Sequence, residues 1–173
     1  MEIMKQLSLF CVIILLVIIM NELVNKLISL NKTIASMESC TGGGFVNAFT
    51  NIPGSSEALR FSAVTYSNEY KIKMGVSSDT ISKYSVYSME VATEMSKQIS
   101  IFADSNYGVG ITGKLNRVDK ANNFGKDNLV YISIYDKDNN KYHNMSVEVT
   151  KNSREGNKNF IINLIVSELL RII

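Results

Sequence analysis

The chain has 173 residues and a formal net charge of +2, from 18 basic and 16 acidic residues interspersed along it. This length suits one α/β domain with a real hydrophobic core, and the charge pattern lacks the basic stripe of a nucleic-acid-binding protein. Two cysteines and one histidine argue against a disulfide scaffold and against a Cys- or His-based metal site. We expect a cytoplasmic domain, because such cysteine usage fits a reducing compartment.

The first predicted element is a hydrophobic segment, since residues 9–20 are unbroken apolar sequence. The run is shorter than the roughly 20 residues that span a bilayer, and no small-residue cleavage site follows it. Three interpretations stay open: an anchor over residues 7–25, a buried helix, or an extension upstream of a true start at Met20. We therefore divide the chain into an N-terminal extension, 1–19, and a domain, 20–173. A membrane-anchored form is the alternative to the cytoplasmic location.

From Met20 onward the apolar residues recur at helical spacing, with Leu23, Leu27 and Leu30 on one face. We expect an amphipathic helix there. A short β-prone run at 33–35 follows and predicts the first strand.

The segment 37–44 carries a serine, a cysteine and three glycines between that strand and a helical pattern starting at Phe45. It predicts a strand-to-helix turn at the C-terminal edge of a sheet, where α/β proteins keep their sites. The free N–H groups of a helix N-terminus bind phosphate or a developing oxyanion. Ser39 is the candidate nucleophile. The alternative is an ordinary turn in which Ser39 caps the helix.

A second strand is predicted over 61–66, after a loop that holds the chain's only proline. Ser67 or Asn68 would cap the helix that follows. If the first two strands are parallel neighbours joined by a right-handed crossover, Tyr66 and Lys71 reach the same sheet edge as Ser39.

A clearer helix begins at Ser88. Its core face is predicted to comprise Val91, Met95, Ile99 and Phe102. Residues 107–112 predict a third, buried strand whose glycines permit close backbone approach and which runs into Gly113. The polar loop 114–128 is long enough to be a lid or a binding loop.

The last part of the chain predicts a β-hairpin, from 129–135 and 142–149, with His143 at the start of its second strand. A final helix runs from Ser153, with an apolar face so broad that it is either fully covered or part of an oligomer contact. The fold class is therefore α/β: a three-layer α/β/α sandwich with a mostly parallel central sheet, a C-terminal β-hairpin and a final helix.

Taken in order, these segments resemble the C-terminal domain of CinA and its stand-alone relatives, the nicotinamide-nucleotide amidohydrolases, over roughly residues 21–173. The motifs are Glu38-Ser39-Cys40-Thr41-Gly42-Gly43, Ile52-Pro53-Gly54-Ser55-Ser56, Val64-Thr65-Tyr66-Ser67-Asn68 with Lys71, Thr112-Gly113, and Arg154. The resemblance implies a domain, often dimeric, that hydrolyses the carboxamide of nicotinamide mononucleotide to nicotinate mononucleotide and ammonia, with no metal or cofactor. It leaves open whether the reaction serves pyridine-nucleotide salvage or accompanies competence.

Carried over residue by residue, the resemblance makes Ser39 the nucleophile, Lys71 its base and Tyr66 a hydroxyl in the same hydrogen-bond network. Substrate binding is expected from Thr41, Gly42, Gly43, Thr112, Gly113 and Arg154. The residues support a Ser-Lys pair, because the one histidine lies in a hairpin and a partly buried lysine has the lowered pKa that a base needs.

Several neighbours of these residues have alternative roles. Backbone N–H groups over 40–43 would hold the oxyanion, and Thr41 would bond the substrate or, slightly favoured, cap the helix. Arg154, alone or with Lys158, would meet a phosphate or stay solvated. Glu38 is expected to be structural, and Cys40 is a minor alternative nucleophile.

The chain departs from the family pattern after Gly113, where the family has a loop rich in glycine and proline. Here the loop carries Lys114, Arg117, Lys120 and Lys126. Either the substrate differs from that of the family, or a phosphate is gripped from this loop. The alternative function is therefore a catalytically altered CinA-like module that binds a nucleotide or a protein partner. A homodimer is expected from the resemblance.

Overall fold

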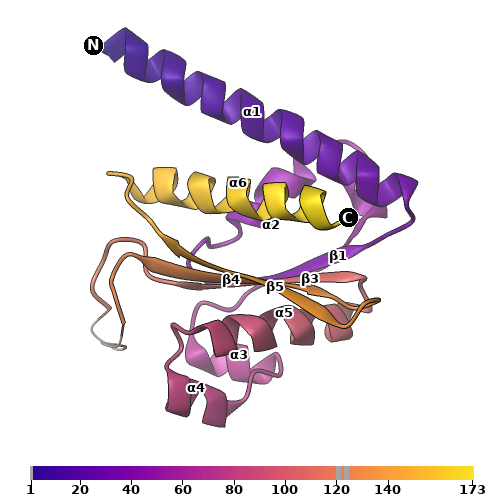
Figure 1. Ribbon diagram of the computed structural model, residues 1–173, viewed down its shortest axis with the longest axis vertical. Helices are drawn as coiled ribbons and strands as arrows, with labels where there is room; N and C mark the ends of the chain where they lie inside the picture. The colour runs from indigo at the N-terminus through magenta and orange to yellow at the C-terminus, as the bar shows by residue number, and fades with distance from the viewer. Residues whose placement is uncertain (1, 120–121, 123–124) are drawn as a thin grey trace.

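The computed structural model describes residues 2–119, 122 and 125–173, with the backbone alone for residues 2–15. A five-stranded sheet of order β2-β1-β3-β4-β5 lies between two layers of helices (Figure 1). The strands are β1 (Ile34–Glu38), β2 (Leu59–Val64), β3 (Tyr107–Gly113), β4 (Leu129–Asp136) and β5 (Lys141–Glu148). β1 pairs parallel with β2 and β3, whereas β3-β4 and β4-β5 are antiparallel. The predicted three-layer fold with a C-terminal hairpin is confirmed, and the sheet is mixed because that hairpin joins it.

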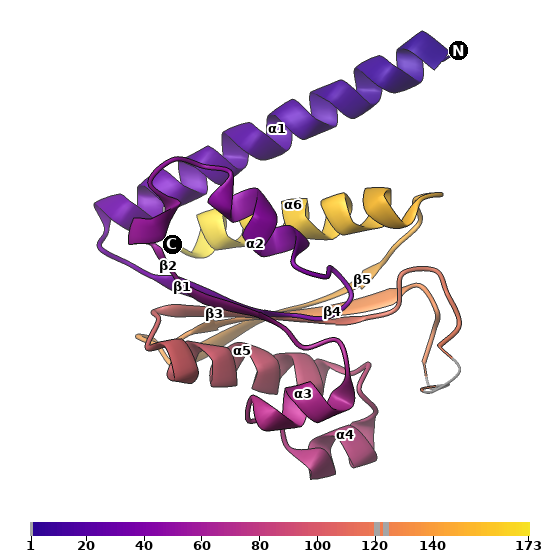
Figure 2. The same cartoon turned by 180° about the vertical axis from the view of Figure 1, so that it is seen from behind.

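The helices divide between the two faces of the sheet (Figure 2). One face carries α1 (Glu2–Ser29), α2 (Gly44–Thr50) and α6 (Arg154–Ile172); the other carries α3 (Asn68–Lys73), α4 (Ser78–Tyr84) and α5 (Met89–Ala103). A 3-10 turn, η1 (Ser55–Glu57), precedes β2. Helix α1 runs unbroken through residues 19 and 20, so it shows no structural boundary there. The division of the chain into 1–19 and 20–173 stays a prediction. Within the residues whose side chains the structure describes, none of the helices is long and apolar enough to cross a membrane.

The C-terminal part of α1 packs as its periodicity predicts, with Met20, Leu23 and Leu27 buried. Leu30 was expected on the same face but is 47% exposed. The reason is that the helix ends at Ser29, and Asn31 then takes a left-handed conformation with φ 53°. The final helix, α6, is covered on its broad apolar face by the sheet, α1 and α2.

Helix α5 confirms Val91, Met95 and Ile99 as core residues, but the prediction for Phe102 is wrong because its side chain is 62% exposed. Phe102 lies in the last turn of the helix, at the rim of the sheet. Its ring packs on Phe61 of the edge strand β2, with 5.0 Å between the ring centroids.

The glycines of β3 serve the packing of α5. A Cβ atom at Gly108 would lie 2.0 Å from the Ser96 carbonyl oxygen, and one at Gly110 would lie 2.3 Å from that of Ala92. No side chain fits at either position, so the helix approaches the strand closely. This contact fixes β3 against α5, while the parallel pairing of β3 with β1 places their C-terminal ends side by side.

Candidate active site

The C-terminal ends of the three parallel strands meet at one edge of the sheet, as the sequence predicts. Glu38, the last residue of β1, is aligned with Val64 of β2 and with Ile111 of β3. The segments that follow these strands therefore converge on one region. They border a cavity of about 1100 Å³, whose other walls come from α3 and the first residue of α6.

The turn after β1 is held by backbone hydrogen bonds and by Glu38. The Glu38 carboxylate is fully buried and accepts from the N–H groups of Phe45, at 3.1 Å, and Val46, at 2.9 Å. A negative charge at a helix N-terminus is favourable, so Glu38 caps α2 from inside the sheet. The structural role expected for Glu38 is confirmed. Gly43 occupies the N-cap position without a side-chain hydrogen bond, so neither Ser39 nor Thr41 caps α2.

Three backbone N–H groups of the turn point to no acceptor within the described part of the chain: those of Cys40, Thr41 and Gly43. The N–H of Gly42 is occupied, because it donates to the Ser39 carbonyl at 3.0 Å. Gly42 and Gly43 adopt left-handed conformations, φ 64° and 86°, which residues with a Cβ rarely tolerate. Of the four N–H groups expected to hold an oxyanion, three are therefore available.

Lys71 and Ser39 form the central pair of the site. Lys71 is 1% exposed, and its Nζ donates to Ser39 Oγ at 3.1 Å and to the Thr65 carbonyl at 2.7 Å. Burial disfavours the charged ammonium and lowers the pKa of Lys71 to about 8. With a pKa of about 8, roughly one molecule in ten carries a neutral amine at pH 7, and this amine can accept the Ser39 proton.

Cys40 lines the cavity beside Ser39 but differs from it chemically. Its thiol is buried, and burial raises the pKa of Cys40 to about 12. A thiol that stays protonated at neutral pH is a poor nucleophile. These properties favour Ser39 over Cys40 for the chemistry.

Tyr66 lies in the cavity wall, but its hydrogen bonds differ from the expected network. Its side chain is 66% exposed, and its hydroxyl accepts from Arg154 Nη2 at 3.4 Å. Among the described residues it bonds neither Ser39 nor Lys71. Tyr66 therefore contacts Arg154 at the cavity wall and is not hydrogen-bonded to Ser39 or Lys71, so its catalytic role stays a prediction.

The residues predicted to bind substrate fall into two groups. Gly113 and Arg154 line the cavity, whereas Thr41, Gly42, Gly43 and Thr112 do not. Thr112 Oγ1 donates to the Val86 carbonyl at 2.9 Å. Thr41 is buried, and its hydroxyl has no hydrogen-bond partner in the described structure. Lys158 reaches the turn from α6, because a Cβ atom on Gly42 would lie 3.3 Å from its Nζ.

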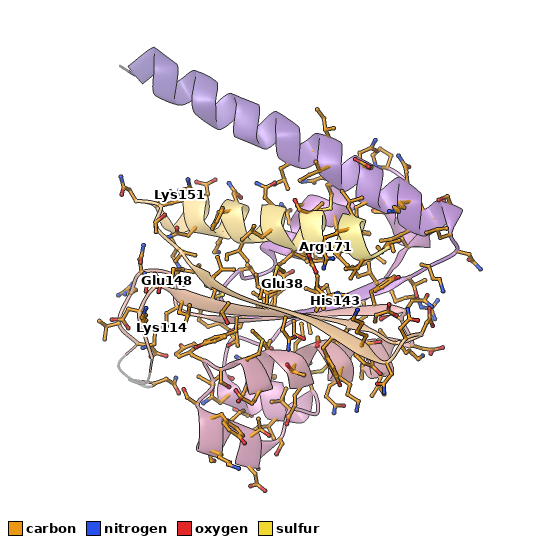
Figure 3. All side chains as sticks on the ribbon, in the orientation of Figure 1. Glu38, Lys114, His143, Glu148, Lys151 and Arg171 are labelled. Carbon is orange, nitrogen blue, oxygen red and sulfur yellow. The ribbon has the colours of Figure 1, made fainter. Side chains whose placement is uncertain are left out.

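The cations of the loop after β3 have different environments. Lys114 is buried, pairs with Asp127 at 2.9 Å and lies over the Tyr87 ring. Lys126 pairs with Glu148 on the surface. Lys120 lies outside the described residues. Arg117 is exposed and lines the cavity. Figure 3 shows Lys114 at the opposite end of the sheet from His143, which lies in β5 as expected.

Tyr87 is a cavity residue that sequence reasoning missed. Its hydroxyl donates to Asp119 Oδ2 at 2.5 Å, and burial holds the pKa of Tyr87 above its ordinary range. The residue precedes the N-cap of α5 and reaches the site only through tertiary contact with the loop after β3, so no local pattern marks it. Across the described residues, no three His, Cys, Asp or Glu side chains are grouped closely enough to hold a metal ion.

Comparisons with known proteins show the family to which the chain is similar. The CinA C-terminal domain model matches residues 17–172. A competence-damage inducible protein homologue of Clostridium botulinum is 36% identical over 148 residues, which cover 84% of this chain and 34% of the relative. A CinA-like protein of Endomicrobium trichonymphae is 43% identical over 83 residues, 47% of this chain and 19% of that protein. The chain spans about a third of the length of the first of these curated relatives.

Solved structures show the same fold. A CinA superfamily protein from Escherichia coli has a TM-score of 0.82 at 21% identity, with 90% of this chain and 88% of that chain covered. A competence/damage inducible protein from Agrobacterium tumefaciens has a TM-score of 0.77 at 23% identity, with coverages of 88% and 94%. At these identities the likeness establishes the arrangement of the elements alone.

Proposed function

The chain belongs to the CinA C-terminal domain family, and on that premise we propose that it is an amidohydrolase. Its substrate is nicotinamide mononucleotide, which it converts to nicotinate mononucleotide and ammonia. The observation that carries the proposal is the buried 3.1 Å contact between Lys71 Nζ and Ser39 Oγ, together with the lowered pKa of Lys71. A serine becomes an effective nucleophile when a neighbouring base takes its proton.

In the first half-reaction, the neutral Lys71 amine takes the Ser39 proton while Ser39 Oγ attacks the carboxamide carbon. The oxyanion that forms would lie against the free N–H group of Cys40, which lines the cavity, with those of Thr41 and Gly43 next to it in the same turn. Lys71 then passes the proton to the amide nitrogen. The C–N bond breaks, ammonia leaves and the acyl group remains on Ser39 as an ester.

In the second half-reaction, Lys71 takes a proton from a water molecule, which attacks the ester carbon. The ester bond breaks, Ser39 regains its proton, and nicotinate mononucleotide leaves. Throughout, the Thr65 carbonyl accepts one hydrogen bond from Lys71 Nζ, at 2.7 Å, and so keeps the amine within reach of the reacting oxygen. The substrate phosphate would meet Arg154, which opens α6 at the cavity wall.

Ammonia release from nicotinamide mononucleotide tests the proposal. We expect the Ser39→Ala and Lys71→Ala variants to lose activity about a thousandfold or more, because each removes one half of the reacting pair. The matched control is Lys73→Ala, since Lys73 lies on the same helix but is exposed and paired with Glu69. Full activity in Ser39→Ala would refute the assignment of the nucleophile.

A second function, a nucleotide- or protein-binding module without catalysis, is favoured by one observation: the cationic loop after β3 occupies the cavity wall. The two functions separate in one comparison. If the wild-type protein binds nicotinamide mononucleotide but releases no ammonia, the binding module is the better description.

A further inference from the structure

We propose that Arg117 binds a phosphate monoester together with Arg154 and thereby makes the site select phosphorylated substrates over their nucleosides. The proposal rests on the proposed function for the identity of the substrate. It deepens that function by naming a specificity-determining residue in the loop where this chain departs from its family. The argument rests on which cations are neutralised, how the loop is supported, and the charge of the ligand.

Among the described cations of the loop, Arg117 is the one whose charge remains available to a ligand. Lys114 is paired with Asp127, and Lys126 is paired with Glu148. Arg117 lines the cavity and has no hydrogen bond or ion pair with the described residues. Arg154 lines the same cavity and donates to the neutral Tyr66 hydroxyl, which leaves its positive charge uncompensated.

The backbone of the loop is fixed on the N-terminal side of Arg117, which places this residue at the cavity wall before any ligand binds. On the N-terminal side, Lys114 N donates to the Leu129 carbonyl at 3.0 Å, and the side chain of Leu115 is buried. Asn116 adopts a left-handed conformation with φ 55°, which turns the chain at this point. A preorganised binding group loses little entropy when the ligand arrives.

The same loop is tied to the segment that carries Arg154. Asn116 Nδ2 donates to the Lys151 carbonyl at 3.4 Å. The buried Asn157 holds Lys151 in place, because its amide group both accepts from Lys151 N, at 2.9 Å, and donates to the Lys151 carbonyl, at 3.2 Å. Arg117 is adjacent to one end of this connection and Arg154 lies three residues beyond the other. These hydrogen bonds connect the segments that carry Arg117 and Arg154, and both residues line the same cavity.

Two arginines match the charge and shape of a phosphate monoester. Such a group carries about −1.5 to −2 charges at pH 7, and a guanidinium pairs two of its N–H groups with two phosphate oxygens. The corresponding nucleoside, nicotinamide riboside, lacks the phosphate and carries a positively charged pyridinium ring, so it offers neither arginine an anionic partner. The cavity should therefore bind phosphorylated ligands more tightly than unphosphorylated ones. Arg117 should increase the affinity for phosphorylated ligands without changing the affinity for unphosphorylated ones.

The test measures binding without turnover, by calorimetry on the Ser39→Ala protein, with nicotinamide mononucleotide and nicotinamide riboside as paired ligands. We expect Arg117→Ala to weaken mononucleotide binding about 10- to 100-fold and to leave riboside binding unchanged. Arg117→Lys should bind the mononucleotide with an affinity between those of Arg117→Ala and its parent, because lysine keeps the positive charge but lacks the paired N–H donors of a guanidinium. Lys126→Ala is the matched control, since it removes a loop cation that is already paired.

Ribose 5-phosphate and ribose, which carry no amide, are titrated in parallel into the same proteins. If no ammonia is ever released from the mononucleotide but phosphate-bearing ligands still bind more tightly in an Arg117-dependent way, the amidase proposal fails and this one holds. Equal affinity of Arg117→Ala and its parent for every phosphate-bearing ligand would overturn the proposal that Arg117 binds the phosphate. So would an equal loss for phosphorylated and unphosphorylated ligands, or no preference for phosphate in the parent.

Discussion

Replacing Lys71 by methionine should change the pH dependence of stability in a direction that the site geometry fixes. Lys71 is almost completely buried, and its pKa falls from 10.5 to about 8 on folding. The folded state therefore binds fewer protons than the unfolded state between these two values. Lys71 costs stability at all pH values below about 8, and this cost disappears as the pH rises toward 10.5 and beyond.

The size of the effect follows from the two pKa values. Lowering the pKa from 10.5 to about 8 corresponds to a cost of about 3 kcal/mol at pH 7, and only about 1 kcal/mol remains at pH 10. Lys71→Met removes this cost but also leaves Ser39 Oγ and the Thr65 carbonyl without their partner, a loss that does not depend on pH in this range. The pH dependence therefore isolates the charge.

The assay is urea unfolding of both proteins followed by circular dichroism from pH 5 to pH 10. The difference in unfolding free energy between variant and wild type should be flat from pH 5 to 7 and should shift by about 2 kcal/mol in favour of the wild type between pH 7 and 10. Lys73→Met, at an exposed lysine, should show no such shift. If the difference in unfolding free energy between Lys71→Met and wild type stayed constant over this pH range, the pKa of Lys71 would not be lowered in the folded protein. The argument for Lys71 as the base would then fail.

Three further predictions concern the same region. The kcat/KM of ammonia release should rise with pH and level off above an apparent pKa of about 8, because Lys71 must be neutral to act; a profile flat from pH 6 to 9 would contradict this. Glu38→Ala should lower the unfolding free energy by about 1 to 3 kcal/mol, since two buried N–H groups of α2 lose their acceptor, whereas an unchanged urea midpoint would show that the cap contributes nothing. Cys40→Ala should keep nearly full activity, and a large loss would reopen the thiol as nucleophile.

The proximity of Ser39 and Lys71 was predictable from the sequence because local rules place each residue. The glycine-rich turn puts Ser39 directly after a strand, and the N-cap Ser67 starts the helix that carries Lys71. The pairing of β1 with β2 then brings the two ends together, and parallel neighbours joined by a right-handed crossover leave little freedom in that step. The fold class followed in the same way from the order of the periodic segments.

Residues at the ends of elements were less predictable, because periodicity says which face a residue occupies but not where the helix or the sheet stops. Leu30 and Phe102 continue the apolar pattern of their helices and are nevertheless exposed. In the first case the chain has already left the helix. In the second, the helix has reached the rim of the sheet, where the ring packs on Phe61 of the edge strand β2 and stays largely exposed.

The binding side of the cavity differs from the catalytic side in how it is determined. Tyr87, Arg117 and Arg154 come from three segments whose approach depends on side-chain contacts such as that of Asn116 with Lys151. No spacing in the sequence encodes such a contact, and a loop can exchange its side chains without disturbing the strands that hold Ser39 and Lys71. The site can therefore keep the contact between Ser39 and Lys71 while the residues around the cavity change, and we expect the ligand preference to depend on the loop after β3 rather than on the turn after β1.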